Sequence, residues 1–139
     1  MELSKLPPQA IDMEEAVLGA VMLESDAFDL IKDFTTAEHF YKEAHYIIYK
    51  AICNINKRKH PIDIMSVTME LKNTKQLDNI GGAWYISQLT NRVATAGNVE
   101  FHARIIYQKF LQREMIRIST TMLNEAYRPE VDSLILLES

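Results

Sequence analysis

The sequence predicts an all-helical protein. Its 139 residues include seven Met but only four Gly and four Pro, so residues that favour helices outnumber those that break them. Apolar residues recur at spacings of three and four, the period of a helix with one buried face. No segment combines two-residue alternation with the composition typical of strands. We therefore expect a compact helical head over residues 11–96, followed by one long helix.

The composition is that of an ordinary globular protein. Hydrophobic residues make up 47% and charged residues 24%, which excludes the low hydrophobicity and high charge of disordered chains. No apolar run approaches the ~18 residues that a membrane helix needs, so we expect a cytoplasmic protein without membrane contact. A formal net charge of −4 and a pI of about 5.5 argue against a nucleic-acid binder, and any DNA contact would be local.

A polar lead-in precedes the first helix. Residues 1–10 contain the pair Pro7-Pro8, which disfavours helix, so this stretch is expected to be flexible. Asp12 then fits the N-cap position, with Glu15 completing a capping box three residues later. The predicted buried face of this helix contains Met13, Ala16, Val17, Ala20 and Val21.

Capping signals mark two further helices. Ser25-Asp26 can cap a short second helix. Thr35 with Glu38 repeats the capping-box spacing before a longer helix, which runs to about Arg58. Its predicted buried face contains His45, Ile48, Tyr49, Ile52 and Ile55. Because His45 lies among apolar residues, we expect it to be a hydrogen-bonded core histidine.

Two more helices complete the head. Asp63 is placed to cap the first, whose predicted buried row is Ile64, Val67, Thr68 and Leu71. A polar loop over residues 73–79 and the turn signal Gly81-Gly82 follow. The second helix is predicted over residues 84–93.

A long helix follows the head. Asn98 can cap a helix that meets no Gly or Pro until Pro129, so it is roughly 30 residues and about 45 Å long. A head of ~100 residues is only about 30 Å across, so much of this helix must project or pack against something else.

The long helix carries two adjacent apolar rows. The first contains Val99, Ala103, Ile106 and Phe110. The second contains Tyr107, Leu111, Met115, Ile118 and Met122. Two rows suggest two partners, and we expect the second row to form a subunit interface.

A second helical arm is predicted after the break at Arg128-Pro129. Residues 131–137 start a new, densely apolar helix that stops with the chain at Ser139. Residues 97–139 are therefore expected to form a helical hairpin with a truncated second arm, in a fragment of a longer protein.

No pattern in the sequence predicts a catalytic, cofactor or metal site. The four glycines form neither a G-x-x-x-x-G-K-[ST] phosphate loop nor a G-x-G-x-x-G dinucleotide motif, so no ATP or other cofactor is expected in this chain. Four potential ligands lie close in sequence, but their spacing fits neither a helical zinc pair nor a finger. They are Glu38, His39, Glu43 and His45. No Ser or Cys lies in a nucleophile motif, which disfavours a small enzyme.

Two basic clusters leave an alternative open. The cluster Lys57-Arg58-Lys59-His60 lies near a helix end, where positive charge complements the helix dipole. Lys109, Arg113 and Arg117 share one face of the long helix, which is either solvated or in contact with phosphates or an acidic partner. The alternative function is a free-standing helical nucleic-acid-binding protein, which the absence of a helix-turn-helix pattern disfavours.

Several short motifs also occur in a specific order. They are Pro7-Pro8, EEAVLGAVM at residues 14–22, Phe40-Tyr41, His45, Ile48, Pro61-Ile62-Asp63, Leu71, Leu77, Gly81-Gly82, Tyr85, Leu89, Asn98 and Arg113-Glu114. Together they resemble the N-terminal domain of DnaB-type replicative DNA helicases, from about Pro7 to about Ile118. Ala94 departs from the pattern, because these proteins often carry a proline before the long helix.

The resemblance implies a six-helix globular head and a helical hairpin, with its first arm from Asn98 to about Tyr127 and its second from Val131. It implies hairpins that pair between subunits into a trimer-of-dimers collar on a hexameric ring. The collar is expected to dock the primase and to shape the ring for the helicase loader.

The resemblance also implies a motor downstream of this chain. That motor would use ATP and Mg²⁺, move along single-stranded DNA and unwind the duplex at the replication fork. The chain itself is expected to be an oligomerisation domain of the primosome that docks the primase and the loader, and not an enzyme.

Overall fold

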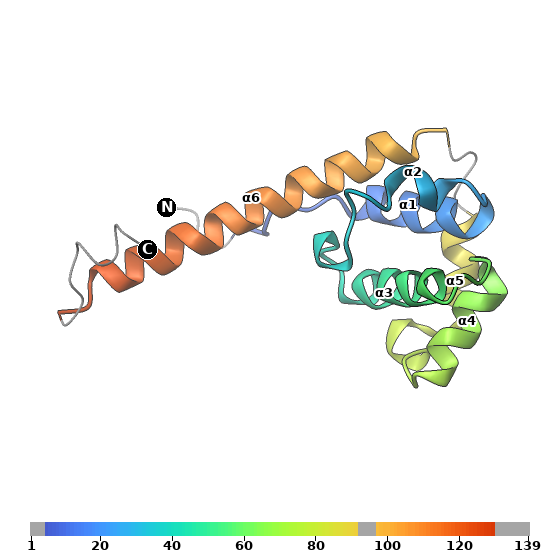
Figure 1. Cartoon of the computed structure of the whole chain (residues 1–139). Helices are drawn as coiled ribbons and strands as arrows, with labels where there is room; N and C mark the ends of the chain where they lie inside the picture. Colours follow the sequence, from blue (N-terminus) through green and yellow to red (C-terminus); the bar gives the residue numbers. More distant parts are fainter. Residues whose placement is uncertain (1–4, 92–96, 130–139) are drawn as a thin grey trace.

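The computed structural model describes residues 5–91 and 97–129, and every regular element in these two ranges is helical. The α-helices are α1 (Ile11–Leu23), α2 (Ala27–Ile31), α3 (Glu43–Lys57), α4 (Ile64–Asn73), α5 (Gly82–Asn91) and α6 (Val99–Ala126). Two 3-10 helices, η1 (Ala37–His39) and η2 (Asp78–Ile80), complete the set. The predicted all-helical fold, a head followed by one long helix, is confirmed (Figure 1).

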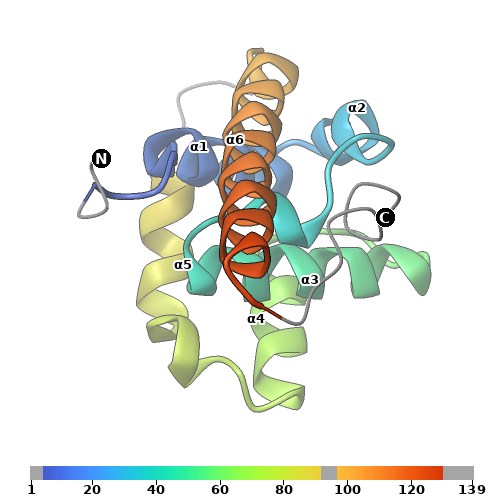
Figure 2. The ribbon, with the colours of Figure 1, turned by 90° about the vertical axis from the view of Figure 1, so that its left-hand side faces the viewer.

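The head is built around α1. This helix packs against α6, α5 and α3, and its middle contributes Val17 and Leu18 to the core. Seen along α6, α1 and α2 lie beneath the start of the long helix, while α3 and α4 form the opposite side of the head (Figure 2). The buried face predicted for α3 is confirmed, because His45 and its four apolar companions are all buried.

The predicted cap of α4 is confirmed, and the predicted cap of α1 is wrong. Asp63 Oδ1 accepts a hydrogen bond from Ser66 N at 2.7 Å, and Ser66 Oγ accepts one from Asp63 N at 2.9 Å. Helix α1 starts two residues earlier than predicted, with Ala10 as its N-cap, so Asp12 lies in the first turn. There its charge still complements the helix dipole.

The long helix predicted after Thr35 is interrupted, which corrects the sequence interpretation. The capping box is one residue later than predicted, with Thr36 N donating to His39 Nδ1 at 3.3 Å, and it starts only the short η1. Helix α3 begins at Glu43, because the buried Glu14 carboxyl group accepts the backbone N–H groups of Tyr41 and Lys42.

The row predicted for α4 is only partly buried. Val67 and Leu71 are buried, whereas Ile64 is exposed and Thr68 is half-buried. Gly81 and Gly82 have φ angles of 104° and 77°, so the predicted turn is confirmed and lies directly before α5. Residues 92–96, which include the predicted Val93 and the departure at Ala94, lie outside the described residues.

Helix α6 projects from the head as predicted. Its 28 residues span about 42 Å at ~1.5 Å per residue. Val99, Ala103 and Ile106 of the first predicted row are buried against the head, and Phe110 is half-buried. The C-terminal part of the helix extends away from the head (Figure 1). Over residues 5–91 and 97–129, no helix combines the length and apolar character needed to cross a membrane.

Candidate protein-interaction site

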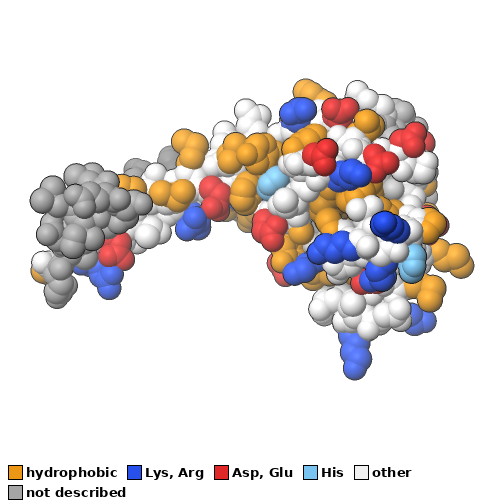
Figure 3. Space-filling model, viewed as in Figure 1, with side chains coloured by type: hydrophobic (Ala, Val, Ile, Leu, Met, Phe, Trp, Pro, Cys, Tyr) orange, Lys and Arg blue, Asp and Glu red, His pale blue; other side chains and the backbone are white. Residues whose placement is uncertain are grey.

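The second apolar row of α6, which we call the exposed row, is only partly covered by the rest of the chain. Its members retain between 39% and 67% of their accessible surface and are Tyr107, Leu111, Met115, Ile118 and Met122. Hydrophobic side chains gather along the projecting part of α6 in the space-filling view (Figure 3). Contiguous exposed apolar surface is typical of protein interaction sites.

A second exposed apolar pair lies on another side of the same helix. Ile116 and Leu123 retain 53% and 49% of their accessible surface. At ~100° per residue, Ile116 lies about 140° around the helix from Leu111. Since the two pairs Leu111/Ile118 and Ile116/Leu123 have the same spacing and similar exposure, they form a matched set for experiments.

The direction of α6 is held by Arg113, at the point where the helix leaves the head. Its Nη1 donates to the carbonyl of Pro8 at 2.8 Å, and its Nη2 donates to the carbonyl of His39 at 2.9 Å. The guanidinium also lies over the rings of Tyr41 and Phe110, at 5.3 and 5.9 Å from their centroids. One side chain therefore joins the lead-in, η1 and α6.

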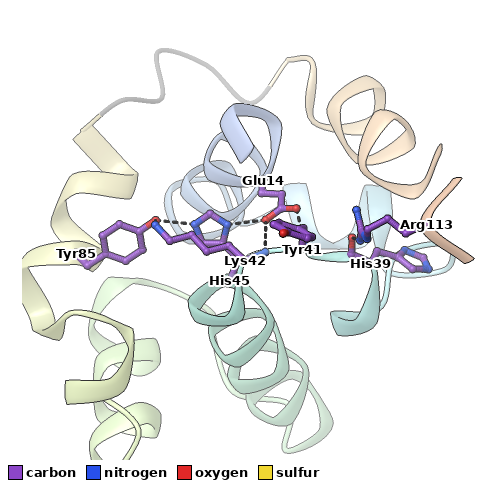
Figure 4. A network of polar contacts seen from close by, with 7 residues as sticks. All are labelled: Glu14, His39, Tyr41, Lys42, His45, Tyr85 and Arg113. Atoms are coloured by element: carbon purple, nitrogen blue, oxygen red, sulfur yellow. Dashed lines mark hydrogen bonds and ion pairs between the residues drawn. The ribbon is translucent and has the colours of Figure 1, made fainter. Parts of the chain in front are cut away.

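His39 and Arg113 together connect the head to α6, and we call this connection the joint. Its ring lies 4.8 Å from the rings of both Tyr107 and Phe110, and its Nδ1 accepts the hydrogen bond from Thr36. Burial lowers the pKa of His39, the Glu38 carboxylate opposes that shift, and the charge of Arg113 adds to it. Figure 4 shows His39 and Arg113 side by side. The neutral ring is the form that fits this packing.

The joint changes the interpretation of two predicted segments. Residues 1–4 lie outside the described residues, but the rest of the lead-in is tied to α6 through Pro8. The predicted basic face is broken up: Arg113 is used inside the molecule, Lys109 is half-buried, and Arg117 donates to Glu114 at 2.9 Å. Arg113 therefore belongs to the fold and is not part of a solvent-facing basic surface.

His45 is a hydrogen-bonded core histidine, as predicted, and it belongs to a longer chain of polar groups (Figure 4). Lys42 Nζ donates to Tyr85 Oη at 3.1 Å, and Tyr85 Oη is hydrogen-bonded to His45 Nε2 at 2.6 Å. A carboxylate can only accept, so His45 Nδ1 donates to Glu14 Oε1 at 2.8 Å.

Sequence reasoning missed the roles of Glu14 and Arg113. The hydrogen-bond partners of both residues lie far away in the chain, at separations of 27 to 31 residues for Glu14 and 74 to 105 residues for Arg113. The available signal for Glu14 was an acidic residue next to the apolar stripe of the first helix. Both residues lie in motifs on which the family resemblance rests.

The described residues contain no cluster of three or more His, Cys, Asp or Glu side chains that could hold a metal ion. The buried polar chain and the joint are both fully engaged in packing and hydrogen bonds within the head. The exposed row and the hollows on the head are not used in this way. Exposed apolar surface of this kind is typical of protein interaction sites.

Comparisons with known sequences agree with this arrangement. A family model described as the DnaB-like helicase N terminal domain matches residues 6–108. The chain is 42% identical over 134 residues to the replicative DNA helicase DnaB of Rhodothermus marinus, covering 96% of this chain and 14% of that protein. It is 40% identical over 134 residues to the replicative DNA helicase DnaB of Geobacillus stearothermophilus, covering 96% and 30%. The chain thus spans less than a third of the length of either relative.

Solved structures share the fold. The crystal structure of the N-terminal domain of DnaB helicase from Mycobacterium tuberculosis aligns with a TM-score of 0.90 and 31% identity, over 96% of this chain and 94% of that one. The structure of a DnaB-like replicative helicase and its interactions with primase aligns with a TM-score of 0.76 over 93% of this chain and 30% of that one. At 23% identity, the second match bears on the fold alone.

Proposed function

The chain belongs to the family of DnaB-like helicase N-terminal domains, and we propose that it serves as the oligomerisation and primase-docking domain of a replicative DNA helicase. The observation that carries the proposal is the exposed row of α6. In the proposed assembly, the exposed rows of two subunits cover each other, and three such pairs form a collar on a hexameric ring.

The energetics favour a weak dimer of this chain alone. Two-fold pairing would cover ten side chains, five from each copy, each of which is about half exposed. Burying half of an apolar side chain contributes about 1 kcal/mol, so the gross gain is roughly 10 kcal/mol. Association costs about 4 to 15 kcal/mol, and we therefore expect a dimer that dissociates on dilution.

Light scattering across a hundredfold dilution tests this pairing. The mass should fall from near twice 16.0 kDa toward 16.0 kDa as the protein is diluted. Leu111→Glu with Ile118→Glu should give a folded monomer at all concentrations. The matched control, Ile116→Glu with Leu123→Glu, places the same charges on the other side of α6 and should still dimerise. A wild-type chain that stays monomeric at millimolar concentration contradicts the proposal.

Primase docking is proposed for the collar that these domains would form. Its support is the family membership, together with a structural relative whose description includes interactions with primase. A pull-down of the C-terminal domain of the cognate primase at low salt should recover a complex. A blank pull-down with the dimeric protein would count against docking on this domain.

The remaining parts of the proposal concern the loader and the whole protein. We propose that the helicase loader also docks on this domain. The relatives are several times longer than this chain, and we propose that the ATP- and Mg²⁺-dependent motor and the single-stranded DNA path depend on that additional length. The chain itself should not bind ATP, because it contains no phosphate loop. Saturable micromolar ATP binding would contradict this assignment.

A further inference from the structure

Two hollows lie along the seam between α3 and α4. These two helices are on the side of the head away from the start of α6 (Figure 1). One hollow of about 360 Å³ is lined by Tyr46, Ile47 and Lys50 of α3 and by Leu71 of α4, among others. A second hollow of about 500 Å³ is lined by Ile55, Arg58, His60 and Met69, among others. Glu70 lines both hollows, so they are neighbours along the seam, and we call the two together the groove.

The segment that carries the groove is the basic part of an acidic molecule, although Glu43 and Glu70 lie beside Lys50 and Arg58 in the lining itself. Residues 42–75 contain seven Lys and Arg against three Asp and Glu, a surplus of four positive charges in a chain whose net charge is −4. One of the three acids, Glu70, is buried and forms an ion pair with Arg58 in the groove. Lysines around the groove are exposed; they include Lys50, Lys57, Lys59 and Lys72. Blue side chains gather over this part of the head in Figure 3.

Two of these lysines occupy backbone positions that favour glycine. Lys59 and Lys75 have φ angles of 59° and 61°, in the left-handed region. Each directly follows the C-cap of its helix in a Schellman motif. The motif after α3 is closed by His60 N donating to Ile55 O, and the motif after α4 by Gln76 N donating to Leu71 O. A lysine there is strained relative to glycine, so the charge comes at a conformational cost.

Apolar side chains flank the basic rim. Met65 and Met69 of α4 retain 75% and 58% of their accessible surface, and Met69 also lines the second hollow. Methionine side chains are flexible and polarisable, and they adapt to the apolar face of a bound helix. Single-stranded nucleic acid instead binds where aromatic rings are free to stack on bases. Along this groove Tyr46 is half-buried beneath Lys50, and Tyr49 is fully buried.

We propose that the groove between α3 and α4 binds an acidic, amphipathic helix of a partner protein. Its apolar face would contact Met65, Met69 and the apolar groove floor, and its acidic face would meet the lysine rim. The hollows follow α3 over its 15 residues, about 22 Å at ~1.5 Å per residue, which accommodates a helix of about 15 residues. This surface is separate from the exposed row, so the proposal stands whether or not α6 pairs.

The test uses a fluorescent, helix-forming peptide of about 18 residues with Leu on one face and Glu on the other. Anisotropy titration should give saturable binding that a Lys-for-Glu version of the peptide lacks. In methionine-methyl NMR spectra, Met65 and Met69 should shift, while Met115 and Met122 of the exposed row should not. Failure of the peptide to bind at millimolar concentration overturns the proposal, as does a shift confined to the row methionines.

The strained lysines provide variants that separate binding from folding. Lys59→Gly with Lys75→Gly removes two rim charges while relieving backbone strain, so stability should be kept or raised and peptide affinity should fall roughly fivefold. The control, Lys32→Gln with Arg128→Gln, removes two exposed charges far from the groove and should leave affinity within about twofold. Equal losses of peptide affinity in the two double variants would show that only the net charge matters, and would refute specific binding in the groove.

Two other occupants would each overturn the proposal. Tighter binding of an oligothymidine than of the acidic peptide, lost in the Lys59→Gly/Lys75→Gly variant, would make the groove a nucleic-acid site. A second copy of this chain is the other candidate, since residues 1–41 carry nine Asp and Glu against two Lys. Self-association that the peptide competes away, and that survives Leu111→Glu with Ile118→Glu, would identify that copy as the occupant.

Discussion

Glu14 shows how one buried carboxyl group can organise several elements. It is 1% exposed and accepts hydrogen bonds from Tyr41 N at 2.7 Å, from Lys42 N at 3.3 Å and from His45 Nδ1 at 2.8 Å. Two of these donors are backbone groups that precede α3. The same side chain therefore ends the η1 segment and fixes the start of the next helix.

Replacing Glu14 with Ala should destabilise the head by about 3 to 5 kcal/mol. The substitution leaves two backbone N–H groups and one ring N–H buried without their acceptor, and each such group carries a desolvation cost. Urea denaturation followed by circular dichroism measures the change. Glu24→Gln, at the exposed end of the same helix, should stay within about 0.5 kcal/mol, and equal effects in the two variants would show that the network is unimportant.

His39 should make the joint sensitive to acid. Burial lowers its pKa in the folded state, so below about pH 6.5, the ordinary histidine value, the unfolded chain binds more protons than the folded one. The stability that His39 contributes is then fully present above that pH and is lost as the pH falls through the folded pKa. Protonation of Nδ1 would also remove the acceptor for Thr36 N.

The measurement is the free energy of unfolding between pH 5 and pH 7.5 for the wild type and for His39→Asn. The Asn side chain can place an oxygen near the position of Nδ1 but does not titrate in this range. Its variant should lose part of the pH dependence of the wild type, even if it is less stable overall. Parallel curves for the two proteins would contradict a role for His39.

At the scale of the helices, the sequence predicted those features that depend on residues close together in the chain. The apolar period located all six α-helices, and the pair Asp63 and Ser66 closes its cap within three residues. The break between η1 and α3 could not be predicted, because it depends on Glu14, which lies 27 residues from Tyr41. The two apolar rows of α6 were visible for the same local reason, whereas the joint at Arg113 depends on contacts across 74 and 105 residues.

Asp63 and Asp12, both predicted as caps, should behave differently when replaced. Asp63→Ala removes an observed side-chain cap and should cost about 1 kcal/mol of stability. Asp12→Ala removes only a first-turn charge from α1 and should cost about 0.3 to 1 kcal/mol at low salt, with the loss shrinking as salt rises. Thermal unfolding of both variants at two salt concentrations checks this. A larger, salt-independent loss for Asp12→Ala would indicate that Asp12 caps the helix after all.

At the scale of the whole molecule, the packed head is separate from the exposed apolar surface of α6. The head buries its apolar residues around α1, and Arg113 and His39 fix the direction in which α6 leaves it. The projecting half of α6 carries apolar side chains that the described part of the chain covers only partly. A helix held rigidly at one end and exposed along one row is suited to align with a second copy.

Chemical crosslinking of single cysteines along α6 tests that pairing most directly. In a Cys53→Ala background, single cysteines would replace Leu111, Met115 or Ile118 on the exposed row, and Ile116 or Leu123 on the other side of the helix. A short bifunctional maleimide should produce a species of twice 16.0 kDa from at least one row cysteine and from neither cysteine on the other side. Crosslinks that form equally on both sides of α6, or only through positions 116 and 123, would contradict pairing through the exposed row.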